Sequence, residues 1–179
     1  MRIIAGARKG ARIAAPRGLD TRPTPDRVRE AAFNLVGPVD GAKVLDLCSG
    51  SGAMGLEALS RGAAGVVLVE RDRTALGVIR RNVETLGLRG AEVVGGDAVA
   101  RAAADARAGR RYDLVLIDPP YRLLPDMLRR LAPHLPAILA EDGLVVVESG
   151  AGLEPELPLP RRTSRRYGSV RLTLFDAPR

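Results

Sequence analysis

The sequence predicts an α/β protein with a doubly wound, mostly parallel sheet of seven strands. It also predicts an antiparallel C-terminal hairpin and a small N-terminal β-hairpin extension. Three observations carry this prediction. Short strand-like runs alternate with helical patterns from residue 43 to residue 150. The run 66–69 (VVLV) is continuously apolar, which is typical of a strand covered on both faces. Two further strand-like runs flank a Gly-Ser turn near the C-terminus.

The first sixteen residues predict the hairpin extension, with arms at 2–5 and 11–15 joined by a turn that contains two glycines. Several prolines then indicate irregular chain. Thr24 followed by Pro25 predicts an N-cap and a first helical position. The helix that begins there has an apolar face through Leu35 and is expected to end before Pro38.

The repeating units begin with a strand at 43–47, a glycine-rich loop and a helix that ends near Gly62. A helical stripe at Leu76, Ile79, Val83 and Leu86 follows the second strand, and Gly87 is expected to end that helix. The remaining expected elements are strands at 91–94, 114–117 and 144–147, helices at 98–108 and about 127–135, and a hairpin of 161–167 with 170–175.

Composition excludes several classes of protein. The chain has 179 residues, 46% hydrophobic and 27% charged, which fits one soluble globular domain. No apolar run reaches the ~18–20 residues that span a bilayer, and no secretion signal opens the chain, so a cytoplasmic location is expected. One cysteine and one histidine indicate neither a disulfide nor a zinc site, and no metal is expected.

The positive charge is concentrated at the two ends of the chain. The net charge is +7, with +5 in residues 1–30, +3 in residues 151–179 and −1 between them. Localised cations favour a polyanionic partner, because contacts to phosphates release counterions. A general bias of the composition toward arginine would produce the same net charge. Charge by itself therefore leaves two interpretations open, a nucleic-acid partner and a compositional bias.

A glycine-rich loop follows the strand at 43–47. Residues 50–55 (GSGAMG) match the dinucleotide fingerprint G-x-G-x-x-G, and Glu70 lies 20 residues after the first glycine. Asp46, just before this loop, suits a ligand with an ammonium and no phosphate better than a pyrophosphate. S-Adenosylmethionine is such a ligand. The residues expected to bind it are Asp46, Ser49, Gly50, Gly52, Glu70, Arg71, Asp97 and Ala98, with Asp97 and Ala98 on the adenine.

The tetrapeptide Asp118-Pro119-Pro120-Tyr121 directly follows the fourth strand. Two prolines stiffen the turn and remove two backbone donors, so the Asp118 carboxylate and the Pro119 carbonyl present acceptors only. This arrangement fits the amino group of a nucleobase that has left its stack. Tyr121, one of only five aromatic residues, offers a flat face for the base. Asp118, Pro119 and Tyr121 are therefore the predicted catalytic residues.

These motifs, in this order, resemble a known family. Residues 1–6 (MRIIAG), 21–34 (TRPTPDRVREAAFN), 46–62 (DLCSGSGAMGLEALSRG) and 118–121 (DPPY) are similar to the bacterial small-subunit rRNA guanine-N2 methyltransferases of the D family. The resemblance covers nearly the whole chain. Family members often carry Phe and Ala where this chain has Cys48 and Ser49.

The resemblance implies a class I methyltransferase, Rossmann-like fold and methyl transfer from S-adenosylmethionine to N2 of a guanine in 16S rRNA, leaving S-adenosylhomocysteine. The substrate would be an assembling or assembled small ribosomal subunit and the enzyme a monomer. It divides the chain into an RNA-gripping hairpin, 1–20, and a methyltransferase domain, 21–179. The implied RNA-binding residues are Arg2, Arg8, Lys9, Arg12, Arg17, Arg22 and Thr24.

Three alternatives stay open on sequence alone. A nicotinamide-dependent oxidoreductase would use the glycine fingerprint but leaves Asp118-Pro119-Pro120-Tyr121 without a role. A non-catalytic RNA-binding assembly factor would keep the fold and transfer no methyl group. A DNA or protein amino-methyltransferase could use the same tetrapeptide. In the favoured interpretation, removing the first twenty residues weakens RNA binding and leaves cofactor affinity intact.

Overall fold

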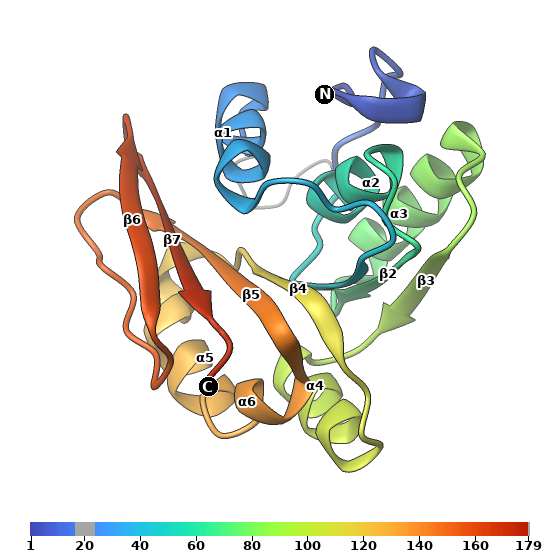
Figure 1. Cartoon of the computed structure of the whole chain (residues 1–179). Coiled ribbons are helices and arrows are strands. Elements are labelled where there is room, and N and C mark those ends of the chain that lie inside the picture. Colours follow the sequence, from blue (N-terminus) through green and yellow to red (C-terminus); the bar gives the residue numbers. More distant parts are fainter. Residues whose placement is uncertain (17–23, 179) are drawn as a thin grey trace.

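The structure is a computed structural model that describes residues 1–16 and 24–178. Figure 1 shows one sheet with helices on both faces. The strands are β1 (Lys43–Leu47), β2 (Gly65–Glu70), β3 (Ala91–Gly95), β4 (Tyr112–Ile117), β5 (Leu139–Gly150), β6 (Arg161–Tyr167) and β7 (Val170–Asp176). The helices are α1 (Asp26–Val36), α2 (Ala53–Ser60), α3 (Arg73–Leu86), α4 (Ala98–Arg107), α5 (Leu124–Leu131) and α6 (Leu135–Ile138), with 3₁₀ turns η1 (Gly6–Arg8) and η2 (Tyr121–Leu123).

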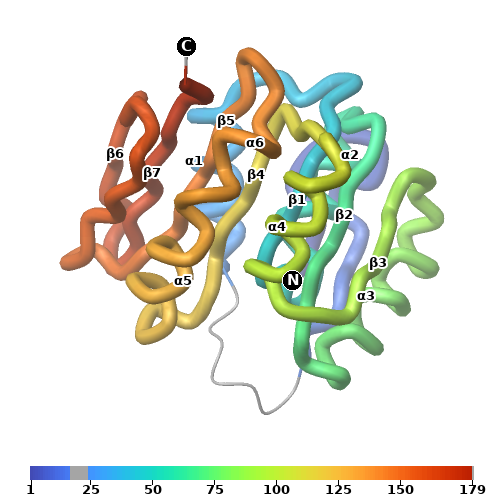
Figure 2. The backbone as a smooth tube through the Cα atoms, turned by 90° about the horizontal axis from the view of Figure 1, so that it is seen from below, coloured from blue at the N-terminus to red at the C-terminus, as the bar shows by residue number. Residues whose placement is uncertain are grey.

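The predicted seven-stranded, mostly parallel sheet is confirmed. Its strand order is β3-β2-β1-β4-β5-β7-β6, which Figure 2 presents from below. Strands β1 to β5 pair in parallel, whereas β7 runs antiparallel between β5 and β6. The order of the chain reverses beside β1, which leaves the loops after β1 and β4 next to each other at the carboxyl ends of the strands. Ligands of open α/β sheets bind at such a point.

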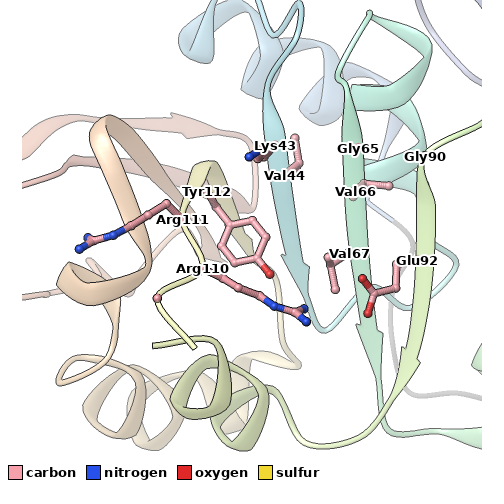
Figure 3. Close-up of a pocket in the computed structure, with 11 residues that line it drawn as sticks. Lys43, Val44, Gly65, Val66, Val67, Gly90, Glu92, Arg110, Arg111 and Tyr112 are labelled. Atoms are coloured by element: carbon pink, nitrogen blue, oxygen red, sulfur yellow. The ribbon is translucent and has the colours of Figure 1, made fainter. Parts of the chain in front are cut away.

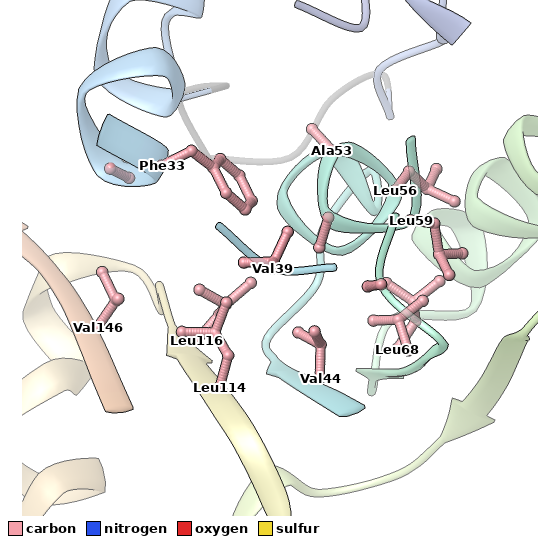
Figure 4. Packing of buried hydrophobic residues seen from close by; sticks show 14 of the residues in the cluster. Phe33, Val39, Val44, Ala53, Leu56, Leu59, Leu68, Leu114, Leu116 and Val146 are labelled. Atoms are coloured by element: carbon pink, nitrogen blue, oxygen red, sulfur yellow. The ribbon is translucent and has the colours of Figure 1, made fainter. Parts of the chain in front are cut away.

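Each face of the sheet carries its own hydrophobic core, because alternate strand residues point to opposite faces. Val44 and Leu114 face α1, α2, α3 and the N-terminal residues Ile3 and Ile13. Figure 4 shows Phe33 of α1 and Leu56 of α2 in the same cluster as Val44 and Leu114 of the strands. Leu45 and its neighbours on the other face pack against α4, α5 and α6.

The N-terminal extension is a hairpin that packs on the domain. Arg2 and Arg12 form an antiparallel bridge, and the turn between the arms is the 3₁₀ turn η1. Glu57 of α2 accepts hydrogen bonds from the backbone amides of Ile4 (2.8 Å) and Ala5 (3.0 Å). Glu57 is fully buried, so these bonds fix the hairpin to α2.

Two local predictions are wrong. The single helix expected at about 127–135 is two helices, α5 and α6, since Pro133 has no amide hydrogen and clashes with the preceding turn in a helix interior. The N-cap of α1 is Pro25, with no side-chain bond, because the hydroxyl of Thr24 turns away to another partner. The boundaries of β1 agree with the prediction, and Gly87 ends α3 in the left-handed conformation as expected.

Candidate functional site

A cavity of about 540 Å³ lies at the carboxyl ends of β1, β2, β4 and β5 and at the loop after β3. Its walls come from segments far apart in sequence. They are Met1, Ala15, Pro16, Thr24, Asp46, Cys48, Ser49, Gly50, Ser51, Ala53, Met54, Val69, Glu70, Arg71, Asp72, Gly96, Asp97, Ala98, Asp118, Pro119, Pro120, Tyr121, Arg122, Leu123, Met127 and Glu148. Six lining residues are acidic and two are basic. This balance favours a cationic or donor-rich ligand over one with a pyrophosphate.

The glycine-rich loop bends sharply between β1 and α2. Cys48, Gly50 and Gly52 all have positive φ, at 72°, 57° and 80°. Such angles are uncommon for residues with a side chain, so Cys48 is the strained position of the loop. A Cβ added to Gly50 would meet no atom within 4 Å, which means that the backbone of this residue borders open space. A ligand can therefore approach the main chain here.

Glu70, at the end of β2, holds two loops together. One carboxylate oxygen accepts the amide of Gly50 (2.9 Å), and the other accepts the amides of Arg71 (2.8 Å) and Asp72 (2.9 Å). Asp72 in turn caps α3 by accepting the amide of Ala75 (2.8 Å). Glu70 thus fixes the glycine-rich loop, besides its predicted place in the cofactor site.

Asp46 is buried, with 2% of its surface exposed. Its Oδ2 accepts the amide of Gly55 in α2 at 3.0 Å. A Cβ on Gly55 would lie 2.5 Å from Leu68, so only glycine permits this close contact. Burial raises the pKa of Asp46 to about 7, with smaller contributions from the negative charges of Asp118 and Glu70. A cationic group bound in the cavity would favour the ionised form of Asp46.

Asp97 and Ala98 lie where the sequence expects them, at the start of α4 on the cavity wall. The carboxylate of Asp97 caps the helix by accepting the amide of Ala100 at 2.9 Å. Asp97 is exposed, so its second oxygen has room for a further partner, whereas Ala98 is buried.

Asp118 follows β4 and lines the cavity. In the sheet β4 and β2 lie on the two sides of β1. Its Oδ2 accepts a hydrogen bond from the hydroxyl of Thr24 at 2.8 Å. Burial raises the pKa of Asp118, and the Thr24 hydrogen bond acts in the other direction. Thr24 was expected to cap α1 and to bind RNA; its hydroxyl bonds to the predicted catalytic carboxylate and caps no helix, whereas its contact with RNA stays a prediction.

Tyr121 lies over the end of β5. A Cβ added to Gly150 would come within 3.3 Å of the Tyr121 ring, so glycine at this position leaves the space that the ring occupies. The Tyr121 hydroxyl donates to Oε1 of Glu148 at a long 3.4 Å. The ring nevertheless keeps 43% of its surface exposed and borders the cavity, as a stacking platform requires.

The structure brings ten of the eleven predicted catalytic and cofactor residues to this one cavity. Gly52 is the exception, because it sits behind the loop as the N-cap of α2 and donates to the carbonyl of Ser49 (2.7 Å). Ser49 itself lines the cavity and donates its hydroxyl to the carbonyl of Asp46 (2.9 Å).

Apart from Thr24, described above, the predicted RNA-binding residues divide into three pairs. Lys9 and Arg12 are exposed, and neither forms an ion pair within residues 1–16 and 24–178. Arg2 pairs with Asp26 (3.1 Å), and Arg8 donates to the carbonyl of Leu86 (2.5 Å), so both also have structural roles. The remaining two, Arg17 and Arg22, lie outside the described residues.

Sequence reasoning missed two polar residues that shape the site. Asn82, buried in α3, donates to the carbonyls of Ala14 (3.0 Å) and Ser51 (2.9 Å) and so joins the N-terminal extension to the glycine-rich loop. No sequence signal distinguishes it. Glu148 does have one, since it follows the apolar run of β5 just as the other acids follow theirs.

A second cavity, of about 510 Å³, opens at the opposite edge of the sheet. Figure 3 shows Tyr112, Arg110 and Glu92 around it, beside the starts of β1 and β2. It contains none of the predicted site residues. The chemistry inferred from the sequence therefore maps to the carboxyl edge alone.

The carboxyl-edge cavity suits the predicted S-adenosylmethionine. A buried carboxylate, open backbone at Gly50 and an acidic lining can receive an ammonium, a sulfonium and an amino-acid backbone. Asp46 and Gly50 would hold the amino-acid part, Glu70 the ribose, and Asp97 with Ala98 the adenine.

Comparison with known proteins identifies the family of this chain. The family described as "Conserved hypothetical protein 95" matches residues 1–176. Ribosomal RNA small subunit methyltransferase D of Escherichia coli (strain K12) is 41% identical over 152 residues, 83% of this chain and 74% of that protein.

Solved structures share the fold. A hypothetical protein of Thermus thermophilus superposes with a TM-score of 0.84 and 34% identity, covering 98% of each chain. An RNA methyltransferase of Salinibacter ruber, solved with S-adenosyl-L-homocysteine, is 21% identical with a TM-score of 0.69, covering 88% of this chain and 94% of that one. The expected class I methyltransferase fold is therefore confirmed. Among the described residues, no helix has both the length and the apolar character needed to cross a membrane.

Proposed function

Because this chain belongs to the family of ribosomal RNA small subunit methyltransferase D, we propose that it transfers a methyl group from S-adenosylmethionine to small-subunit rRNA. The proposed acceptor is the N2 amine of a guanine in 16S rRNA. The enzyme is proposed to act as a monomer, without a metal, on an assembling or assembled small subunit.

One observation supports this proposal most. The Asp118-Pro119-Pro120-Tyr121 corner and the acidic, glycine-rich wall with Asp46 line the same cavity. An amine acceptor corner and a site for a cationic cofactor are thus within one enclosure. A nicotinamide oxidoreductase needs no such corner, and the excess of carboxylates is unfavourable for a pyrophosphate.

In the proposed mechanism the chain mainly positions the reacting amine. The Asp118 carboxylate and the Pro119 carbonyl accept its two hydrogens, and the exposed face of Tyr121 stacks on the base. S-Adenosylmethionine, when bound, supplies the methyl group. As the proposed acceptor of an amine hydrogen, the Asp118 carboxylate would also receive the proton that the methylated nitrogen loses. No covalent bond between enzyme and base is required.

The N-terminal extension is proposed to hold the RNA. Residues 1–20 carry the exposed Lys9 and Arg12, and residues 21–179 form the methyltransferase domain. Arg2, Arg8, Arg17 and Arg22 complete the proposed basic surface. Phosphate contacts of this kind provide affinity that falls with salt.

The experiment is methyl transfer with a labelled donor to small subunits that lack the modification, followed by mapping of the labelled nucleotide. Label on a guanine N2 of 16S rRNA is expected. Label only on DNA or protein would favour the other amino-methyltransferases, and RNA binding without any transfer would favour an assembly factor. Calorimetry with NAD and with S-adenosylmethionine separates the oxidoreductase alternative.

Asp118→Ala tests the acceptor corner directly. Turnover is expected to fall by at least about a hundredfold, because the amine loses its charged acceptor. Cofactor affinity should stay near that of the wild type. Asp142→Ala, an exposed aspartate within β5, is the matched control. Near-normal turnover of Asp118→Ala would reject the assigned role.

A further inference from the structure

Glu148 is the one acidic residue of the cavity wall whose position mirrors that of Asp118. Val147 of β5 pairs with Ile117 of β4 in parallel register, so Glu148 and Asp118 are the next residues of neighbouring strands. Glu148 is 7% exposed and lines the same cavity. Its side chain thus belongs to the proposed acceptor corner, although the tetrapeptide motif does not include it.

The corner has many hydrogen-bond acceptors and few donors. Within residues 1–16 and 24–178, Thr24 donates to Asp118 at 2.8 Å and Tyr121 donates to Glu148 at 3.4 Å. Two carboxylates have about eight lone-pair positions. Buried acceptors with few donors are unfavourable. Burial together with the charge of Asp118 raises the pKa of Glu148 to about 8, although hydrogen bonds from Thr24 and Tyr121 act in the other direction. Further donors from a ligand would favour the ionised form of Glu148. A ligand edge that consists of adjacent N–H donors would relieve this deficit.

Among the standard bases, the ring nitrogen beside the amine decides which edge fits. Guanine presents N1–H next to its N2 amine, so these two adjacent groups both donate hydrogen bonds. Adenine has the N1 lone pair beside its N6 amine, and cytosine has the N3 lone pair beside its N4 amine. A carboxylate opposite that ring nitrogen attracts guanine and repels the other two.

We propose that Glu148 is the residue that specifies guanine: its carboxylate accepts N1–H while Asp118 and the Pro119 carbonyl hold the N2 amine. This inference rests on the proposed function. Glu148 is a positioning residue, because it contacts the base but not the nitrogen that is methylated. Fixing N1 also orients the amine, since both nitrogens belong to one rigid ring.

The test reverses this hydrogen bond: the acceptor on the enzyme becomes a donor, and the donor on the base becomes an acceptor. In Glu148→Gln, an amide NH₂ can face the ring nitrogen. In the substrate, 2-aminopurine keeps the N2 amine but has a lone pair at N1. Small subunits are reconstituted with 16S rRNA that carries either guanine or 2-aminopurine at the mapped target. Glu141→Gln, an exposed glutamate of the same strand, is the control.

The wild type and Glu141→Gln should methylate guanine at least tenfold faster than 2-aminopurine. In Glu148→Gln the rate of methylation of guanine should fall at least tenfold and the rate for 2-aminopurine should rise. The ratio of the two rates therefore narrows or reverses. Calorimetry with S-adenosylmethionine and a thermal melt establish that the variant is folded. A purely structural role for Glu148 cannot produce a gain on the altered base.

The failures are distinguishable. If the wild type does not label guanine, the proposed function and this inference both fail. If the wild type labels guanine but Glu148→Gln keeps the same preference, the inference alone is wrong. Loss of transfer to both bases by a folded variant that binds cofactor would also overturn it, because recognition of N1 predicts a gain on one of them.

Discussion

The hydrogen bond between Thr24 and Asp118 gives the most direct test of the reaction site. Thr24→Val has nearly the same shape as threonine but removes the hydroxyl that donates to Asp118 at 2.8 Å. Thr24 is 8% exposed, so water has little room to replace the lost donor. Hydrogen bonds to charged groups contribute about 1.5–3 kcal/mol, which corresponds to roughly a tenfold to hundredfold effect.

The direction follows from the charge. The hydroxyl stabilises the ionised form of Asp118, so its removal raises the pKa of that carboxyl further above the ordinary value. The carboxylate is the form that accepts the amine hydrogens. Turnover should therefore increase as the pH rises, and the increase in Thr24→Val should occur at higher pH than in the wild type. Because Glu148 and Asp46 lie close by, the profile reports the cluster rather than one group.

The assay is labelled methyl transfer at saturating cofactor and RNA from mildly acidic to mildly alkaline pH. Thr24→Val is expected to be about tenfold to hundredfold slower near neutral pH and to recover partly at higher pH. Thr24→Ser keeps the hydroxyl and should stay close to the wild type. Thr74→Val, on the exposed surface of α3, is the control. A Thr24→Val enzyme with wild-type rates and an unchanged pH profile would refute the reasoning.

Two further predictions concern the cofactor and the RNA. The pKa of Asp46 in the folded chain is about 7 against an ordinary 3.8, so between roughly pH 4 and 7 the unfolded chain binds fewer protons and stability falls as the pH rises. Asp46→Asn should therefore raise Tm at pH 8. It should also weaken the binding of S-adenosylmethionine measured by calorimetry, because the cationic cofactor loses a carboxylate. An unchanged Tm together with an unchanged cofactor affinity would contradict this prediction. Lys9→Ala combined with Arg12→Ala should weaken RNA binding and reduce the slope of log affinity against log salt by about 1–2, whereas Arg107→Ala should not; equal slopes would exclude a phosphate contact.

Where one local rule dominates, the sequence was sufficient to predict the structure. The run at 43–47 became β1 with the expected limits, and the stripe from Leu76 to Leu86 became the buried face of α3. Asp46, Glu70, Asp97 and Asp118 were each predicted to be site residues, and all four line one cavity. Parallel pairing alone produces this result, because it aligns the carboxyl ends of the strands.

Predictions were wrong or incomplete where two local rules competed or where the partner is distant in sequence. Threonine is a common N-cap residue, but the hydroxyl of Thr24 donates to Asp118, 94 residues away in the sequence. A buried carboxylate is a stronger partner than a helix terminus that water can reach. Glu148 was missed for a different reason. Glu148 directly follows the apolar run 144–147, as the other acids follow theirs, but β5 continues to Gly150, so Glu148 lies inside the strand and not in the loop after it.

The N-terminal extension contributes to the core and to the cofactor cavity as well as to the basic surface. Removal of the first twenty residues was expected to affect RNA affinity alone. However, Met1, Ala15 and Pro16 line the cofactor cavity, and Ile3 and Ile13 are buried in the core. Their loss would open the cavity and leave the buried carboxylate of Glu57 without its two backbone donors. Such a truncation changes folding, cofactor binding and RNA binding together. Only substitutions at exposed cations such as Lys9 and Arg12 can change RNA affinity without changing cofactor binding and methyl transfer.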